Sequence, residues 1–204
     1  KNGFTPAMAA AYYGKAEALE ILIKSGADLS IPEKNGGTAL HIAVQHGHTD
    51  CIQAILGSKQ GEKLLNRPDK DGYTPAIEAA YHGKAKALDV LIKKGADLSI
   101  TAKRGSTALH VAAQHGHTGC IKAILKSEEG KKTLDTFDKN WYTPAMAAAH
   151  CGKAEALEVL IQNGADLSKK TIMVFGNTAR DIAISQKNDQ CRAVIDKRSN
   201  NTTL

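Results

Sequence analysis

Short blocks of small, apolar and polar residues follow one another along the chain, and residues 74–83 show the first kind of block clearly. Thr74 is a good helix N-cap, and Pro75 suits a first helical turn because its missing N–H costs nothing there. The small and apolar residues at 76–80 predict a helix that a neighbour can approach closely, and Gly83 ends it.

The next block predicts a second helix and then a loop. Apolar residues at 88 and 90–92 define this helix, and Gly95 stops it. Residues 99–106 carry turn signals and a glycine, which predict a projecting hairpin or finger. Neither helix can bury its apolar face alone, so each unit must stack on its neighbours.

The N-cap threonine and the five residues after it recur as a hexad through the chain. The copies are TPAMAA from Thr5, TALHIA from Thr38, TPAIEA from Thr74, TALHVA from Thr107, TPAMAA from Thr143 and TARDIA from Thr178. Successive threonines are 33, 36, 33, 36 and 35 residues apart. This regular spacing predicts a repeat protein.

The hexad and its spacing resemble the T-P-L-H-x-A motif and the 33-residue period of the ankyrin-repeat family, over essentially the whole chain. The resemblance implies an all-α solenoid of stacked helix-turn-helix units with projecting β-hairpin or loop fingers. We expect a single domain. Its repeats span about 1–32, 33–68, 69–101, 102–137, 138–172 and 173–204, and the last is the C-terminal capping repeat.

Two types of repeat alternate. The first, third and fifth share GKAxAL and GADLS, whereas the second and fourth share TALHxAxQHGHT and carry three extra residues, around 58–65 and 127–134. The repeating unit is therefore a pair of 69 residues, which recent duplication explains most simply. We expect the insertion to lengthen the second helix or the loop after it, forming an outer ridge once in every two repeats.

The two ends of the array differ in polarity. In the last repeat, Arg180-Asp181 replaces Leu40-His41 of the second repeat, and Arg192 and Asp196 replace an isoleucine and a leucine. These polar residues predict a capping repeat that faces water. The first repeat has no such replacements, so we expect the chain to be the C-terminal part of a longer array.

Composition and charge narrow the classes of function. Aromatic residues make up only 4% of the chain, so the core must be built from Ala, Leu, Ile and Val. The net charge of +6 would attract an acidic partner, but it is modest for nucleic-acid binding by 204 residues. No run of 18 apolar residues occurs, so no membrane span is expected.

The cysteines indicate a reducing compartment. Cys51, Cys120 and Cys191 each fall 13 residues after a hexad threonine, at a core position of the second helix. Two repeats put them roughly 20 Å apart, whereas disulfides need Cα atoms within about 7 Å. We therefore expect free thiols and a cytoplasmic or nuclear protein. Cys151 is expected to be exposed on a first helix, as a contact residue rather than a nucleophile.

The eight histidines raise the question of a metal site. His41 and His110 stand at the hexad position where, in the ankyrin family, a histidine hydrogen-bonds the neighbouring hairpin. His48 and His117 match the Gly-His that starts the link between helices. No Cys-x-x-Cys, His-Glu-x-x-His or phosphate-binding glycine loop accompanies them. We expect these histidines to be structural, with no metal, no cofactor and no catalysis.

The resemblance also implies where a partner binds, because ankyrin proteins usually hold it on a concave face of finger tips and first-helix ends. The candidate contact residues are Phe4, Tyr12, Tyr13, Gln45, His46, Tyr73, Tyr81, His82, Lys103, Arg104, Gln114, His115, Trp141, Tyr142 and His150. Seven of the nine aromatic residues are in this set. Tyr and Trp are favoured in binding hot spots because they offer large rigid area with a polar group.

Structural explanations stay open for part of this set. Phe4, Tyr73 and Tyr142 can instead pack the base of each hairpin. The mixed charges of the finger tips can be an ordinary solvated surface, or they can receive an acidic stretch of the partner, steered by Lys103-Arg104.

The function that we expect is a monomeric, non-catalytic scaffold that binds a peptide or folded domain of another protein. A second hypothesis makes the chain the targeting module of a larger enzyme, or of an effector that a bacterium delivers into the host cytosol. A third hypothesis, nucleic-acid or anionic-surface binding, follows from the positive charge and predicts a steep salt dependence.

Overall fold

The computed structural model describes residues 3–172 and 176–201, and every regular element in these ranges is a helix. Most of the helices form six pairs. The first helices of the pairs are α1 (Pro6–Tyr12), α3 (Ala39–His46), α6 (Pro75–Tyr81), α8 (Ala108–His115), α11 (Pro144–His150) and α13 (Ala179–Ser185). The second helices are α2 (Ala16–Lys24), α4 (Thr49–Leu56), α7 (Ala85–Lys93), α9 (Thr118–Leu125), α12 (Ala154–Gln162) and α14 (Asp189–Asn201). The prediction of an all-α solenoid is confirmed.

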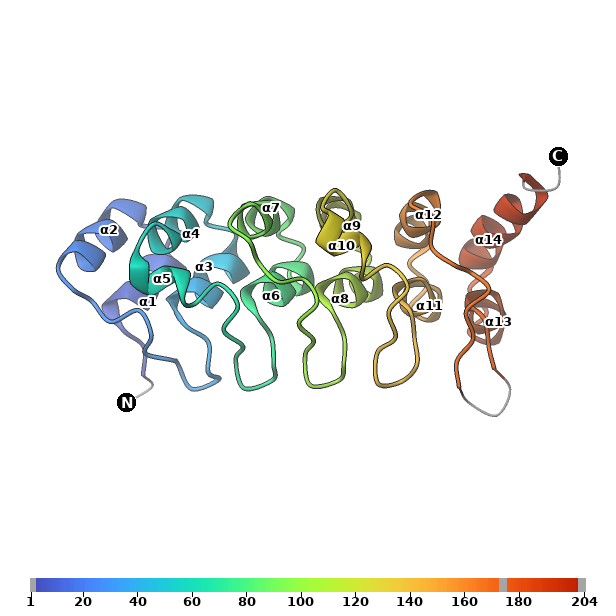
Figure 1. The fold of residues 1–204 in the computed structure, drawn as a ribbon, viewed down its shortest axis with the longest axis horizontal. Coiled ribbons are helices and arrows are strands. Elements are labelled where there is room, and N and C mark those ends of the chain that lie inside the picture. Colours follow the sequence, from blue (N-terminus) through green and yellow to red (C-terminus); the bar gives the residue numbers. More distant parts are fainter. Residues whose placement is uncertain (1–2, 173–175, 202–204) are drawn as a thin grey trace.

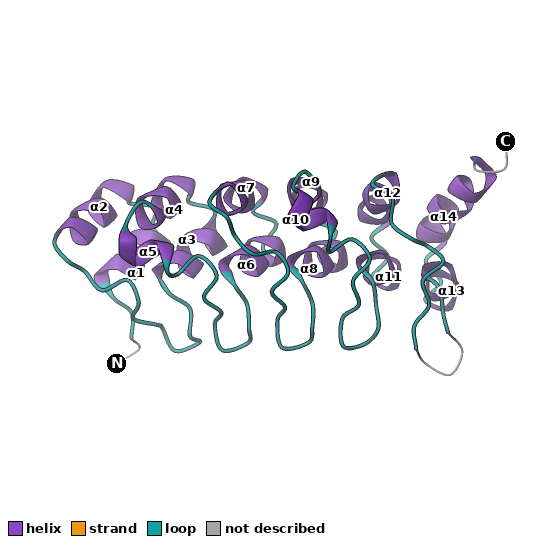
Figure 2. Ribbon diagram, in the orientation of Figure 1, coloured by secondary structure: helices purple, strands orange, loops and turns teal. Residues whose placement is uncertain are grey.

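The pairs stand side by side in one row, with the first helices in one layer and the second helices in the other (Figure 1). Each inner first helix contacts the first helices on both sides, as α8 contacts α6 and α11. The connections between pairs project beyond the first helices as fingers, which Figure 2 shows as loops. The fingers have their tips at 33–37, 69–73, 102–106 and 138–142, where the residue that opens the tip donates its N–H to the carbonyl of the residue that closes it. We call the surface made by the fingers and the first helices the finger face.

Each first helix begins directly after the threonine of its hexad, which is its N-cap. The Thr74 backbone is extended, and its hydroxyl accepts a hydrogen bond from the Ile77 N–H at 3.3 Å. A cap of this kind contributes about 1 kcal/mol. Ala79 and Ala80 behind it are fully buried, because their small side chains let neighbouring helices approach closely.

The second helices are amphipathic. In α7, Ala87, Leu88 and Leu91 are buried, while the side chain of Lys93 is mostly exposed. The same pattern in the other pairs joins their buried residues into one core that runs the length of the row.

The hexad histidines tie one pair to the next finger. His41 Nδ1 accepts the Thr38 N–H at 3.2 Å, so its Nε2 carries the proton and donates to the Tyr73 carbonyl at 3.1 Å. His110 makes the same contacts with Thr107 and with the Tyr142 carbonyl, at 3.3 and 3.0 Å. Burial lowers the pKa of both histidines and so favours the neutral rings that these bonds need. Their predicted structural role is confirmed.

The three extra residues of the second and fourth repeats lie in one-turn helices, α5 (Lys59–Glu62) and α10 (Glu128–Lys131). Ser58 caps α5 by accepting the Gly61 N–H at 3.0 Å. Gly61 is buried against the end of α4, where a Cβ atom would overlap a backbone carbonyl oxygen. The insertion thus lengthens the loop after the second helix, which is one of the two predicted outcomes.

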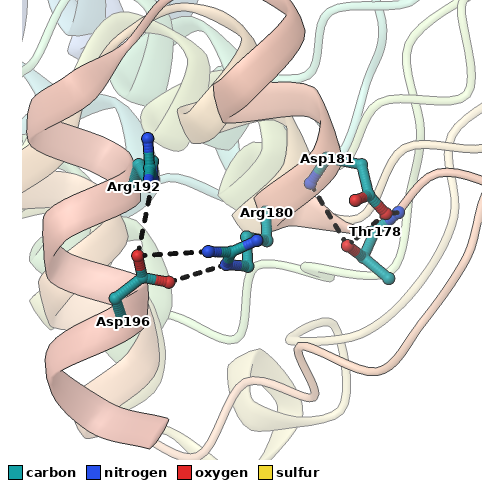
Figure 3. Close-up of polar contacts among 5 residues, drawn as sticks. All are labelled: Thr178, Arg180, Asp181, Arg192 and Asp196. Atoms are coloured by element: carbon teal, nitrogen blue, oxygen red, sulfur yellow. Dashed lines mark hydrogen bonds and ion pairs between the residues drawn. The ribbon is translucent and has the colours of Figure 1, made fainter.

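The polar side chains of the last repeat lie at the surface of α13 and α14 (Figure 3). Arg180 pairs with Asp196 at 2.6 Å, and Arg192 approaches the same carboxylate at 3.5 Å. Asp181 replaces the hexad histidine by accepting the Thr178 N–H at 2.9 Å. At the opposite end, Ile21 on α2 is 64% exposed.

The cysteines follow the prediction with one exception. Cys51, Cys120 and Cys191 are free and completely buried at equivalent positions of the second helices. Burial raises the pKa of the Cys120 thiol to about 12. The expectation of an exposed Cys151 is wrong, because this residue caps the end of α11 and is half-buried there.

Candidate functional site

The predicted contact residues lie on the finger face, at the ends of the first helices and on the fingers. Among the residues that the structure describes, Phe4, Tyr12, Tyr13, Tyr81 and Trp141 are the most exposed aromatics, with 40–68% of their surface accessible. The other members of the set are polar or half-buried. Gln45, Lys103, Arg104, Gln114, His115 and His150 are exposed, and His46, Tyr73, His82 and Tyr142 are half-buried.

The aromatic rings form the same group twice, two repeats apart. In the first group, the Tyr12 ring lies 4.4 Å from His46 and 6.4 Å from Phe4, between ring centroids. In the second group, the Tyr81 ring lies 4.6 Å from His115 and 5.8 Å from Tyr73. Residues at the helix ends and at the finger bases therefore belong to one surface. Tyr142 and His150 form a third pair at 5.5 Å.

The second histidine of each His-Gly-His segment holds this surface in place. The His48 Nε2 atom lies 3.1 Å from the Tyr12 carbonyl, and His117 Nε2 lies at the same distance from the Tyr81 carbonyl. Each ring therefore bonds the backbone at the end of the preceding first helix. In the last pair, Asn188 takes this place and donates to the Ala149 carbonyl at 2.7 Å.

The packing explanation holds for two of the three residues at finger bases. Tyr73 and Tyr142 pack against the core, and their carbonyls receive the hexad histidines. Phe4, by contrast, is 49% exposed. Tyr73 and Tyr142 thus support the surface, while Phe4 and the tyrosines at helix ends offer accessible area.

Trp141 occupies a backbone conformation that favours glycine. Its φ is +61°, at the finger position two residues before the hexad threonine. The equivalent residues are glycines with positive φ, namely Gly3, Gly36, Gly72, Gly105 and Gly176. A bulky residue in this region costs about 1–2 kcal/mol. The Trp141 ring is nevertheless 43% exposed and lies 5.8 Å from the Phe137 ring, between centroids. Because backbone strain at an exposed residue contributes nothing to folding, Trp141 is a candidate for function.

A recess of about 700 Å³ lies in the middle of the finger face, between the fingers at 69–73 and 102–106 and the ends of α6 and α8. Glu78 lies in it with 16% of its side chain exposed, and its Oε1 is 3.1 Å from His82 Nε2. Burial, and then the nearby Asp69 and Glu33, raise the Glu78 pKa to about 7. Burial and the neighbouring Lys84 lower the pKa of His82, so near neutral pH the two groups make a hydrogen bond with little ionic character.

Sequence reasoning missed Glu78, although a signal existed. Its hexad reads TPAIEA where the sister repeats read TPAMAA, so Glu78 stands where α1 and α11 have Ala9 and Ala147. Whether that carboxyl is buried depends on the finger that covers it.

The charges on the finger tips are mixed. Lys103 pairs with Asp71 of the preceding finger at 3.6 Å, and both side chains are mostly exposed. Exposed pairs of this kind contribute roughly 0–1 kcal/mol, so they leave the tips free to rearrange around a partner.

Other features of the described residues are less informative. No group of three or more His, Cys, Asp or Glu residues within 3–172 and 176–201 is arranged to hold a metal ion. None of the helices in these ranges is long and apolar enough to cross a bilayer. A second hollow of about 630 Å³ lies between α12 and α14, in the second-helix layer.

Comparisons with known proteins agree with this architecture. A family model described as ankyrin repeats in three copies matches residues 1–67, 59–136 and 79–171. The ankyrin repeat protein nuc-2 of Neurospora crassa is 30% identical over 183 residues, which are 89% of this chain and 16% of that protein. The target of rapamycin complex 2 subunit AVO2 of Saccharomyces cerevisiae is 31% identical over 137 residues, 66% of this chain and 31% of that protein.

A solved structure has the same fold. The crystal structure of EF0377, an ankyrin repeat protein, superposes with a TM-score of 0.79 at 24% identity, over 96% of this chain and 98% of the other. The chain spans less than a third of the length of the curated relatives named above.

Proposed function

The chain belongs to the ankyrin-repeat family, and we propose that it is a non-catalytic scaffold whose finger face binds another protein. Ankyrin repeats are generally protein–protein interaction modules. The observation that carries the choice of face is the position of the accessible aromatic residues. Only 4% of the chain is aromatic, yet Phe4, Tyr12, Tyr13, Tyr81 and Trp141 are all exposed on the finger face.

The arrangement supports binding through a few aromatic anchors. Tyr12 and Tyr81 are held by neighbouring histidine rings, so little side-chain entropy remains to be lost when a partner covers them. The net charge of +6 and the lysines of the finger tips would steer an acidic patch of the partner toward this face. A partner would then bury the tyrosines and Trp141 at the centre of the contact.

An affinity pull-down from native lysate, followed by binding measurements on the captured partner, tests the proposal. We expect Tyr12→Ala, Tyr81→Ala and Trp141→Ala together to reduce affinity at least 100-fold, because truncating a single hot-spot aromatic costs about 2 kcal/mol or more. Ile21→Ala is the matched control, since Ile21 is an exposed apolar residue on α2, away from the finger face. An unchanged affinity of the correctly folded triple variant would refute the choice of face.

A second candidate function is that of a targeting module within a larger protein, including an enzyme. The small share of each relative that this chain covers, 16% of nuc-2 and 31% of AVO2, favours it. Reading the complete gene tests this candidate. An open reading frame without any further domain would eliminate it.

Three buried cysteines with free thiols support a reducing compartment for the protein, which we also propose to be a monomer. We therefore place the protein in the cytoplasm or nucleus. Cell fractionation and sedimentation of the purified chain test the two statements. A secreted protein or a stable dimer would contradict them.

A further inference from the structure

The recess in the middle of the finger face differs chemically from the rest of that face. Its floor is the carboxyl of Glu78 on α6, and its walls include Tyr73, Tyr81 and His115. The volume of about 700 Å³ is large enough to admit a long side chain of a partner together with water.

Glu78 is not required by the repeat fold. The sister helices α1 and α11 fold with alanine at the same position. Within the described residues its hydrogen-bond partner is His82, and the acidic groups that act on it are Asp69 and Glu33. Lys103 on the rim is engaged with Asp71 instead. The carboxyl is thus largely buried beside other acids, without a cation to balance it, which is the usual sign of a group kept for binding.

The aromatic walls of the recess suit a cation, as the Glu78 carboxyl on its floor does. The Tyr73 and Tyr81 rings lie 5.8 Å apart between centroids, and Tyr81 is 40% exposed. Aromatic rings attract ammonium and guanidinium groups and also pack against the methylene stems of Lys and Arg. A guanidinium can in addition bond a carboxylate with two parallel hydrogen bonds.

We propose that this recess takes one basic side chain, lysine or arginine, of the bound protein, with its charged group on the Glu78 carboxylate and its stem against Tyr73 and Tyr81. This inference rests on the proposed function and narrows it. Because the rim carries Lys103 and Arg104, the fitting partner segment has a single basic residue with acidic neighbours. Glu78 is then a specificity-determining residue of the finger face.

A library of random dodecapeptides displayed on phage, selected in parallel on the full chain and on its Glu78→Ala variant, tests the inference. Glu78→Ala restores the TPA-x-A-A sequence of the sister repeats, so it should fold. Glu78→Gln keeps the shape and removes the charge. Glu155→Ala, which removes an exposed carboxylate on α12, is the matched control.

We expect the peptides selected on the full chain to contain one Lys or Arg whose replacement by Gln weakens binding at least tenfold. The same replacement should change binding to Glu78→Ala and Glu78→Gln less than twofold, and the control should behave like the parent chain. The inference would be overturned if replacing the basic residue weakened binding equally on all the proteins. It would also be overturned if the selected peptides had no essential basic residue, or if none of them depended on Tyr81 for binding.

The two proposals fail in different ways. If the peptides depend on Tyr81 and Trp141 but not on a basic residue, the finger face binds and the role of Glu78 is wrong. If a captured protein partner binds the triple variant unchanged, the finger face itself is wrong.

Discussion

Glu78→Gln should make the protein more stable at neutral and alkaline pH, because the substitution removes a buried negative charge. Burial raises the Glu78 pKa from its ordinary 4.5 to about 7, with Asp69 and Glu33 adding to the effect. At about 1.4 kcal/mol for each pKa unit, this rise corresponds to an upper limit of about 3 kcal/mol. The predicted gain is therefore up to about 3 kcal/mol at pH 8.

The pH dependence has a definite sign. The folded chain holds the Glu78 proton up to about pH 7, whereas the unfolded chain loses it near 4.5. The parent should thus lose stability relative to Glu78→Gln as the pH rises between these values, and the two chains should match near pH 4. The other titratable or charged groups around the recess, which include His82, His115, Lys103 and Arg104, are present in both chains and largely cancel.

Urea unfolding of both chains between pH 4 and 8 measures this difference, since urea carries no charge that would screen it. Far-UV circular dichroism and Trp141 fluorescence should report coincident transitions, because one free energy of unfolding applies only to one cooperative step. A difference between the chains that does not vary with pH, or a parent that is more stable at pH 8, would refute the reasoning.

Three further predictions concern other positions. Trp141→Gly should change the free energy of unfolding by less than about 1 kcal/mol, because relief of the left-handed backbone, about 1–2 kcal/mol, offsets a lost aromatic contact of about 0.5–1.5 kcal/mol. The affinity for the partner should still fall at least tenfold. An unfolded variant or an unaffected affinity would contradict this prediction. Gly61→Ala should lower the free energy of unfolding by about 1–3 kcal/mol, because the added Cβ overlaps a backbone carbonyl. Gly57→Ala is the control: its φ of −80° is compatible with alanine, so the variant should stay within about 1 kcal/mol of the parent in the same urea titration. Iodoacetamide at pH 8 should label Cys151 alone in the folded chain, because Cys120 and its equivalents are completely buried; mass spectrometry of the digest would reveal a contradicting label at Cys120.

The helix pairs could be read from the sequence because every hexad begins with a capping threonine and continues with small residues, and three of the six add a proline at the first helical position. The polar cap was equally readable, since Arg192 and Asp196 interrupt an apolar pattern that the other repeats keep. These are local signals; the structure confirms the helix pairs and places the polar side chains of the last repeat at its surface.

Other features depend on three-dimensional packing and could not be read from the local sequence. The short helix α5 has only Ser58 as a sequence signal, and its place is set by the close approach of Gly61 to α4. Glu78 looks like a surface residue in its own helix, but the fingers on either side bury it. Cys151 was expected to be exposed, yet as the last residue of its helix turn it is half-covered.

Hydrogen exchange of the free chain and of its complex with the captured partner tests the central claim most directly, because backbone amides report the bound face without any substitution. We predict new protection at the finger tips 69–73, 102–106 and 138–142 and at the C-terminal ends of α6 and α8. Protection confined to the second helices, such as α7, α9 and α12, with unchanged exchange in the fingers, would contradict the account.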